Sequence, residues 1–497
     1  MARPFIRKVP TASGAAAVQI VFKHGSDITK IEHIGSAHND LELELLIAIA
    51  NNRLDELQPR LDLFGNNSPD AYMKRSYSEL LWKVLVDQYN EMGFGIIDDE
   101  IFKQLVLARI IEPTSKLDTI RVLRNLGLVA PANSSIHRCL RRIVDQDYRT
   151  KASASCFERA SVHSLSLLLY DVTTLYFEVQ KEDEYRKPGM SKERRLDPQI
   201  TVGLLVGRDG SPLEVMSFEG NRAEVKTIME VLDAFKARYG LDELTVTADA
   251  AMLSSKNIQA LEDMGYHYII GSRIAKTPYE IAEYVKEPDQ ELKDKQIFDT
   301  IQIMNTGKKT ARVKRRVIYQ YRKDRASLDL RNIDKLVDKA QKMVEGKASF
   351  KRNRFLKVEG TSKTINHSLI AESRLKAGVK GYATDLDIPP LEIINAYHQL
   401  FEVERSFRMA KSDLLARPIF HQKRDPIEAH LTIVFAALAI SRRIQAKTGL
   451  SIKRFLHLLE PLKTGVLSLN GALHEFRPKI DEEVRAVLQN LTNHEIW

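Results

Sequence analysis

Cysteine and long apolar runs are scarce in this 497-residue chain, and each scarcity excludes a class of protein. The only two cysteines, Cys139 and Cys156, show no CxxC spacing, which excludes a disulfide scaffold and a cysteine-ligated zinc finger. The longest strongly apolar run, residues 431–440, is about half the ~20 residues of a membrane-spanning helix. The apolar stretch behind the basic N-terminus is broken by Gln19 and makes a poor secretory signal. We therefore expect a soluble, cytoplasmic protein with no membrane partner.

Repeats and low-complexity tracts are also missing, so several domains must account for the length. A single hydrophobic core stops growing near ~250–300 residues. Apolar residues make up 43% of the chain and charged residues 28%, which excludes wholesale disorder. We expect two or more domains, or one domain that carries a large insertion.

Positive charge is concentrated in one segment. The whole chain carries +9, whereas residues 301–360 alone carry +12, from 18 Lys and Arg against 6 Asp and Glu. Such a local surplus is typical of a nucleic-acid contact, and we place candidate DNA contacts at Lys314, Arg315 and Arg316. The other interpretation is a solvated surface whose scattered charges bind nothing.

The first third of the chain predicts a small β element followed by helices. Residues 18–22 and 28–34 are rich in β-forming residues and flank a turn, which indicates a hairpin. Apolar residues at three- to four-residue spacing then predict helices from about residue 40 to residue 151. Within that stretch a basic cluster offers weak candidates for contacts to a DNA backbone: His137, Arg138, Arg141 and Arg142.

The middle of the chain alternates between strands and helices, which predicts an α/β fold. The expected order over residues 164–270 is β-β-β-α-β-α-β, with strands near 165–177, 199–206, 213–219, 244–247 and 266–270. The alternation breaks after residue 275, where we expect strands at 296–304, 311–321, 354–359 and 367–371 around one helix at 330–345. Helix resumes after the prolines at 389 and 390, and residues 451–497 are expected to be mainly helical.

Two aspartates stand beside predicted strands. Asp171 follows a nearly continuous apolar run, and Asp249 ends the run at 244–248. Residues at strand ends line the crevice where α/β sheets bind ligands, so neighbouring strands would place both carboxylates in one site. The alternative is that each Asp only caps the element that follows it.

A third carboxylate lies on a late helix. Tyr397, Glu404 and Lys411 are seven residues apart, and seven residues return almost to the same azimuth of a helix, so they are expected in one row with Arg408 nearby. An exposed ion pair between Glu404 and Arg408 is the alternative.

Together Asp171, Asp249 and Glu404 offer hard oxygen ligands. Such ligands suit Mg²⁺ or Mn²⁺, and suit zinc poorly. Two such ions can activate an attacking oxygen and stabilise a leaving oxygen in phosphoryl transfer. Beside a basic segment, this set predicts an enzyme that cuts a polyanion.

Three sequence blocks resemble the catalytic blocks of bacterial insertion-sequence DDE transposases. The blocks are Tyr170-Asp171-Val-Thr-Thr-Leu175, Thr247-Ala-Asp249-Ala250 and Tyr397-(2)-Leu400-(3)-Glu404-(6)-Lys411. The resemblance is closest to the subgroup with a Tyr-x2-Arg-x3-Glu-x6-Lys signature. Flanking segments are similar too: Gly220-Asn221, Lys323-Asp324-Arg325 and Arg417-Pro418-Ile-Phe-His421.

The resemblance implies an RNase H-like catalytic domain interrupted by a mainly β insertion domain, with a mainly helical N-terminal region. The implied divisions are a β element at 1–40, a helical DNA-binding region at 41–160, the catalytic domain at 161–274 and 386–450, the insertion at 275–385 and a helical tail at 451–497. Asp171, Asp249 and Glu404 would bind the metal, and Tyr397 and Lys411 would contact phosphates. The signature Arg falls on Leu400, so Arg405 or Arg408 would supply that charge.

The implied activity is that of a transposase working as a homodimer on terminal inverted repeats and target DNA, among the nucleoid DNA of a bacterial cytoplasm. Two alternatives stay open: a host nuclease or resolvase of the same fold that cuts without joining, and a catalytically inactive, transposase-derived DNA-binding protein. Removing residues 1–150 is expected to abolish end-specific binding.

Overall fold

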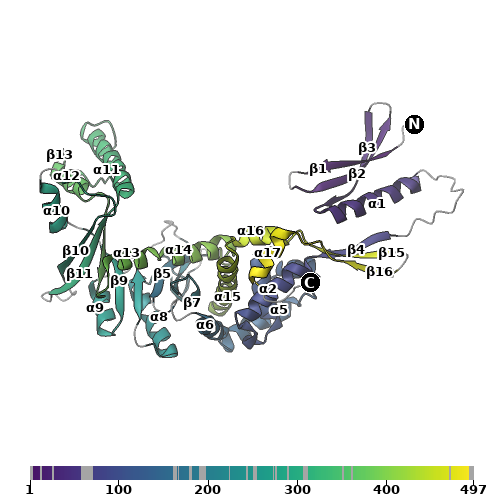
Figure 1. Cartoon of the computed structure of the whole chain (residues 1–497), viewed down its shortest axis with the longest axis horizontal. Coiled ribbons are helices and arrows are strands. Elements are labelled where there is room, and N and C mark those ends of the chain that lie inside the picture. Colours follow the sequence, from purple (N-terminus) through teal and green to yellow (C-terminus); the bar gives the residue numbers. More distant parts are fainter. Residues whose placement is uncertain are drawn as a thin grey trace. The chain divides into compact units, whose positions relative to one another are not determined.

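The computed structural model divides the chain into two compact units (Figure 1). Unit 1 comprises Met1–Cys156, Met409–Ala416 and His421–Trp497, and unit 2 comprises Phe157–Arg408 and Arg417–Phe420. The described residues are 4–11, 14–24, 27–57, 71–160, 165, 167–177, 182–189, 197–222, 224–241, 244–249, 255–272, 274, 277–287, 290–305, 312–349, 352–359, 362–469 and 472–491. Each unit is described by itself.

Unit 2 is built on an eight-stranded sheet in the order β10-β11-β14-β9-β8-β5-β6-β7. Its strands are β5 (Leu167–Tyr176), β6 (Gln199–Val206), β7 (Pro212–Glu219), β8 (Thr245–Ala248), β9 (His267–Ser272), β10 (Ile297–Asn305), β11 (Arg312–Tyr321) and β14 (Val379–Thr384). β8 pairs in parallel with β5 and β9, and the other neighbours are antiparallel. With α8 (Glu224–Tyr239) and α9 (Ser255–Asp263), the predicted order β-β-β-α-β-α-β is confirmed.

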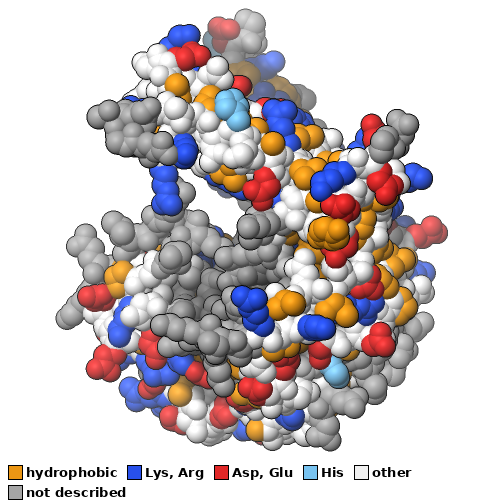
Figure 2. All heavy atoms as spheres, turned by 90° about the vertical axis from the view of Figure 1, so that its left-hand side faces the viewer, with side chains coloured by type: hydrophobic (Ala, Val, Ile, Leu, Met, Phe, Trp, Pro, Cys, Tyr) orange, Lys and Arg blue, Asp and Glu red, His pale blue; other side chains and the backbone are white. Residues whose placement is uncertain are grey.

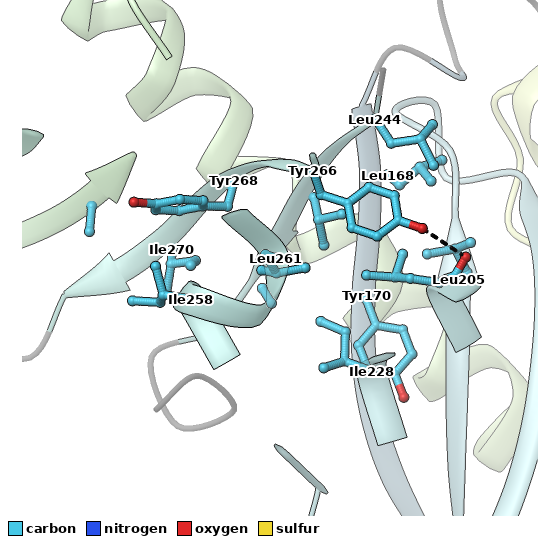
Figure 3. Close-up of a cluster of buried hydrophobic side chains, with 14 of the residues drawn as sticks. Leu168, Tyr170, Leu205, Ile228, Leu244, Ile258, Leu261, Tyr266, Tyr268 and Ile270 are labelled. Carbon is cyan, nitrogen blue, oxygen red and sulfur yellow. Dashed lines mark hydrogen bonds between the residues drawn. The ribbon is translucent and has the colours of Figure 1, made fainter. Parts of the chain in front are cut away.

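One face of this sheet packs on α8 and α9 through large buried side chains (Figure 3). Three alternate residues of β5, Leu168, Tyr170 and Val172, enter this core, because side chains alternate along a strand. The hydroxyl of Tyr170 donates to Thr227 Oγ1 at 2.9 Å, so the buried phenol is satisfied. All eight residues of β6 are buried, as the near-continuous apolar sequence predicts for a central strand.

The predicted separate β insertion is wrong in part. Strands β10, β11 and β14 extend the same sheet. The remaining elements are largely helical: α10 (Tyr279–Lys286), α11 (Lys323–Val344), β12 (Leu356–Glu359), β13 (Ser362–Ile365) and α12 (His367–Leu375). The strand expected at 367–371 is helix, because the Asn366 side chain accepts the Leu369 N–H at 3.1 Å and caps it. α11 and α12 close over a small core at Phe355.

Unit 1 begins with a three-stranded sheet and continues as a helical bundle. β2 (Ala16–His24) pairs with β3 (Asp27–Ala37), which confirms the predicted hairpin, and β1 (Phe5–Pro10) adds an edge strand. Helix α1 (Asp40–Leu57) packs on this sheet. The bundle contains α2 (Glu79–Glu91), η1 (Phe94–Ile97), α3 (Glu100–Ile111), α4 (Thr119–Asn125), α5 (Asn133–Asp145), the start of α6 (Tyr148–Arg159), α15 (Arg424–Thr448), α16 (Ile452–Leu459) and α17 (Glu482–Leu491).

Helix α15 supplies the core of unit 1. Its apolar run, residues 431–440, is buried throughout. Among the described residues, no helix combines the length and the hydrophobicity that crossing a membrane requires.

Residues 424–448 belong to unit 1, whereas the sequence had placed them in the catalytic domain. Deleting residues 1–150 would remove α2, α3 and α5, which pack against α15, so point substitutions are the sounder test of DNA-end binding.

A second sheet in unit 1 corrects two further expectations. β4 (Ala71–Tyr77) lies in the region expected to be helical, and the hairpin of β15 (Thr464–Leu469) and β16 (Ala472–Phe476) lies in the tail expected to be mainly helical. β4 pairs with β15, so the sheet joins residues nearly 400 positions apart in sequence. Local periodicity does not reveal a pairing of that range.

Gly203 in β6 offers a test of the core of unit 2. A Cβ at this position would lie 2.3 Å from the Tyr170 hydroxyl oxygen. Because Thr227 fixes that hydroxyl, we expect Gly203→Ala to destabilise the chain by about 1–3 kcal/mol. Gly465→Ala is the matched control, since its Cβ would meet nothing within 4 Å. Urea unfolding should show a lower midpoint for the first variant alone; equal midpoints would contradict this packing.

Candidate active site

The two aspartates lie on adjacent strands of unit 2. In the parallel pair of β5 and β8, the last paired residues are Leu169 and Thr247, two positions before Asp171 and Asp249. Leu168, Tyr170, Val246 and Ala248 belong to the core on the α8 and α9 side. Because side chains alternate along β5, Asp171 projects from the opposite face. Continued by two residues, the register would bring Asp249 level with Asp171.

Asp171 differs from its predicted position at a strand end. It lies inside β5, which continues to Tyr176 along β6. Asp249 does follow the last residue of its strand, Ala248. Asp171 is half-buried and Asp249 is exposed. Asp171 and Asp249 thus lie at a step in the sheet, where β8 has ended at Ala248 and β5 continues to Tyr176.

Tyr397 reaches this step from α13 (Pro390–His398). Helix α13 packs against β8, β9 and β14, and the Tyr397 hydroxyl donates to Asp249 Oδ1 at 3.3 Å. Burial and then the charge of Asp249 raise the pKa of Tyr397. The phenol therefore remains protonated and orients the Asp249 carboxylate.

Glu404 lies on α14 (Phe401–Arg408), which packs against β5 and β6. The predicted single row of Tyr397, Glu404 and Lys411 is wrong. α13 ends at His398, α14 starts at Phe401, and Lys411 lies in the π-helical segment Met409–Asp413 of unit 1. The seven-residue spacing thus spans three elements, and the contact of Lys411 with phosphate stays a prediction.

The alternative interpretation of Glu404 as half of an ion pair is not supported. Among the described residues, neither Glu404 nor Arg408 forms an ion pair, although both are exposed. Arg405 instead pairs with Glu402 at 3.8 Å. Leu400, which occupies the signature Arg position, is 9% exposed. Arg408 is therefore the better candidate for the missing charge.

Lys380 is a site residue that the sequence did not reveal. It lies on β14, and its Nζ is 4.2 Å from the centre of the Tyr397 ring, a cation–π distance. Burial and then the charge of Arg325 lower the pKa of Lys380, while the charges of Asp249 and Glu404 act in the opposite sense. One ammonium group is thus within electrostatic reach of two candidate ligands. The only sign of Lys380 in the sequence is a charged residue within the mostly apolar run 377–383. The strand that contains this run was not predicted.

Two of the three basic residues predicted on β11 hold the fold together. Arg315 is 3% exposed, and its Nε and Nη2 donate to the Glu262 carboxylate at 2.8 Å each. Arg316 binds Asp299 and the backbone carbonyls of Leu386 and Ile388. Their assignment as DNA contacts is wrong because Arg315 is buried and Arg316 is held by Asp299 and two backbone carbonyls. Lys314 is exposed and remains a candidate.

The basic cluster of α5 in unit 1 also contains both a structural residue and exposed residues. Arg142 donates to Asp99 Oδ2 at 2.6 and 2.9 Å, and Asp99 caps α3. Arg142 is therefore structural. His137, Arg138 and Arg141 are exposed.

The sequence comparison decides the family. A family model described as a transposase DDE domain matches residues 163–440, more than half of the chain and all three carboxylates. The chain belongs to the DDE transposase family. It is a DNA transposase, an enzyme of DNA transposition and recombination, and the enzymes of this family are metal-dependent.

Two further comparisons add little. None of the curated proteins matches this transposase. Among solved structures, a piggyBac transposase synaptic complex with hairpin DNA matches at 11% identity over 84% of this chain and 77% of the other, with a TM-score of 0.37. That likeness is too low to carry an argument about fold or function.

The residues of the transposase fit a divalent cation by donor type. Asp171, Asp249 and Glu404 supply hard oxygens, which suit Mg²⁺. Two hydroxyls, Thr247 Oγ1 behind Asp249 and Ser406 Oγ on α14, are buried with no hydrogen-bond partner in the described part of the chain. Within that same part, however, no three His, Cys, Asp or Glu side chains are close enough to hold an ion. The structure therefore does not gather Asp171, Asp249 and Glu404 around one point.

The role of Arg315 can be tested by stability. Burial would raise the pKa of Glu262, but hydrogen bonds from Arg315 and Tyr268 lower it below its ordinary value. Arg315→Met leaves that carboxylate unpaired and should cost about 2–3 kcal/mol of unfolding free energy at neutral pH. Lys314→Met, at an exposed neighbour, should stay within about 0.5 kcal/mol.

The same pair predicts a pH dependence. A lowered folded-state pKa stabilises the protein above the ordinary glutamate pKa of ~4.3, and this contribution is lost as the pH falls through the lower folded value. The difference between wild type and Arg315→Met should therefore shrink in acid. A difference that is constant with pH would contradict the ion pair.

Tyr397 can be tested through metal activation. Tyr397→Phe keeps the ring under Lys380 but removes the hydrogen bond to Asp249, so we expect Mg²⁺ to activate DNA cleavage about 10- to 100-fold less effectively. Tyr382→Phe is the control, because the Tyr382 hydroxyl contacts His398 at 3.4 Å and not Asp249. Equal Mg²⁺ titrations for both variants would show that the Tyr397 hydroxyl does not orient the carboxylate.

Proposed function

We propose that this transposase mobilises an insertion sequence by cutting DNA at terminal inverted repeats and joining the freed 3′ ends to target DNA. The carrying observation is the register of β5 and β8, which pairs Leu169 with Thr247 and, continued by two residues, would bring Asp171 level with Asp249. Helix α14, which carries Glu404, packs against β5 and β6. The strand order β7-β6-β5-β8-β9, antiparallel and then parallel, supports an RNase H-like catalytic domain.

Asp171, Asp249 and Glu404 would hold Mg²⁺ or Mn²⁺, two ions in the full site. Bound there, the ions supply activation of the attacking oxygen and charge stabilisation of the leaving oxygen. Tyr397 keeps Asp249 oriented, since its protonated hydroxyl can only donate to the carboxylate. Exposed Asp249 and Glu404 let a phosphodiester approach from solvent, while half-buried Asp171 anchors the site in the sheet.

The chain's own cations complete the proposed chemistry. Arg408, exposed at the end of α14, suits a phosphate next to the scissile bond, and Lys411 follows three residues later in the chain. Each step is one in-line displacement, in which the oxygen–phosphorus bond of the leaving strand breaks as the bond to water or to a 3′-hydroxyl forms. No covalent link between protein and DNA is required.

Recognition of DNA ends is assigned to unit 1. Exposed Arg138 and Arg141 on α5 carry charge that no described ion pair uses, which suits contacts to a DNA backbone. Because two ends must be cut and joined together, we propose a homodimer in the complex with DNA, acting on the nucleoid DNA of a bacterial cytoplasm.

The proposal is tested with Asp249→Asn. This substitution keeps the shape of the side chain and removes the charge that a metal needs, so we expect cleavage and strand transfer to fall by at least about 100-fold. Binding of end-containing DNA should be retained, because the basic residues are unchanged. Full cleavage by the variant would refute the assignment.

The products distinguish this function from its rivals. Wild-type protein with Mg²⁺ should give both cleaved ends and joined products in a gel assay. Cleavage without joining would favour a nuclease or resolvase. DNA binding with neither product on the correct ends would favour an inactive, transposase-derived DNA-binding protein.

A further inference from the structure

A cleft opens beside Asp249 in unit 2. Its volume is about 570 Å³, and its walls come from the end of β9, from α11 and α12, from β14 and from Tyr397 of α13. Figure 2 faces this end of the molecule, where Lys and Arg side chains lie interspersed with Asp and Glu. The cleft therefore continues the candidate active site along the surface of α11.

Cations outnumber acids in the lining. Arg325, Arg354, Lys376 and Lys380 line the cleft, against Asp249 and Asp329. Asp329 is partly used by the fold, because its Oδ2 accepts the backbone N–H of Gly378 at 3.0 Å. The charged side chains of the cleft thus sum to a net positive charge.

Two of these cations are available to a ligand. Arg325 is 46% exposed in its side chain and is 3.6 Å from Asp329, an exposed pair that contributes little. Arg354 is exposed and forms no ion pair with any described residue. Lys376, by contrast, is 12% exposed in its side chain and pairs with Glu372 at 3.4 Å, and Lys380 covers Tyr397.

The apolar part of the lining belongs to the fold. Ile333 and Phe355 pack in the small core between α11 and α12. They offer no hydrogen-bonding groups to a base edge, whereas guanidinium groups match phosphate oxygens. The arginines of the lining are therefore suited to the phosphates of a sugar–phosphate backbone.

We propose that this cleft binds the backbone of the DNA strand that runs past Asp249, with Arg325 and Arg354 as its phosphate contacts. The inference rests on the proposed function for the identity of the polymer. Two separate arginines along a cleft that ends at a carboxylate suit an extended polyanion, because a small anion needs donors that converge on one point. The arginines of the basic segment 301–360 that contact DNA are then Arg325 on α11 and Arg354 before β12, and not Arg315 or Arg316 on β11.

The test measures how DNA affinity of the full-length protein depends on salt. Each phosphate contact contributes about 0.9 to the slope of log K against log salt concentration on duplex DNA. Arg325→Ala with Arg354→Ala should therefore lower the slope by about 1.8, equally on end-containing and unrelated duplexes of one length. Lys335→Ala with Lys342→Ala removes the same charge from α11 outside the cleft and should leave the slope within error.

A charge-preserving variant protects the test against misfolding. Arg325→Lys with Arg354→Lys should restore most of the slope, since Lys binds phosphate as a point charge. An unchanged slope in the alanine variant, or a loss confined to end-containing DNA, would overturn the proposal. The alanine variant could lower the slope while wild-type protein shows no Mg²⁺-dependent cleavage. In that case the proposed function fails and the cleft assignment stands.

Discussion

The parallel hydrogen bonding of β5 with β8 is the constraint on which the active site depends. It pairs Leu169 with Thr247, and the same register continued by two residues would bring Asp171 level with Asp249. Two like charges side by side in a sheet would repel each other and would be costly to desolvate. The surroundings moderate this cost: Asp249 is exposed, Tyr397 donates to it, and the ammonium of Lys380 is within electrostatic reach. A divalent cation is the natural complement to what remains.

How far the sequence predicts this site depends on the range of the interactions. Asp171 and Asp249 were recognisable because apolar strands reveal polar interruptions, and the order of strands and helices around them followed from periodicity. The interruption of the helix between Tyr397 and Glu404 was not predicted, because a seven-residue spacing in the sequence does not show whether the helix is continuous. Lys380 was missed for a different reason: its strand lies 131 residues after Asp249, and the pairing of β14 with β9 is tertiary.

The basic segment shows why charge counts overstate binding surfaces. In composition, Arg315, Arg316, Arg325 and Arg354 are equivalent. In the structure, β11 joins the central sheet. Arg315 therefore forms a salt bridge with Glu262 on α9, and Arg316 donates hydrogen bonds to backbone carbonyls. The arginines on and near α11 lie outside the sheet and keep their charge at the surface. Which arginine can reach DNA is thus decided by sheet topology, which no local pattern encodes.

The path of the chain between the two units has a consequence for folding. The chain passes from one unit to the other four times, and the core of unit 1 is closed by α15 and α17. The side chain of Gln88, for instance, donates to the carbonyl of Leu491, 403 residues later. Contacts of such sequence separation are slow to form. The N-terminal helices therefore emerge from the ribosome without their core and must wait for the last helix, which exposes apolar surface during synthesis. A chain that stops before α15 would lack the buried helix against which α2, α3 and α5 pack.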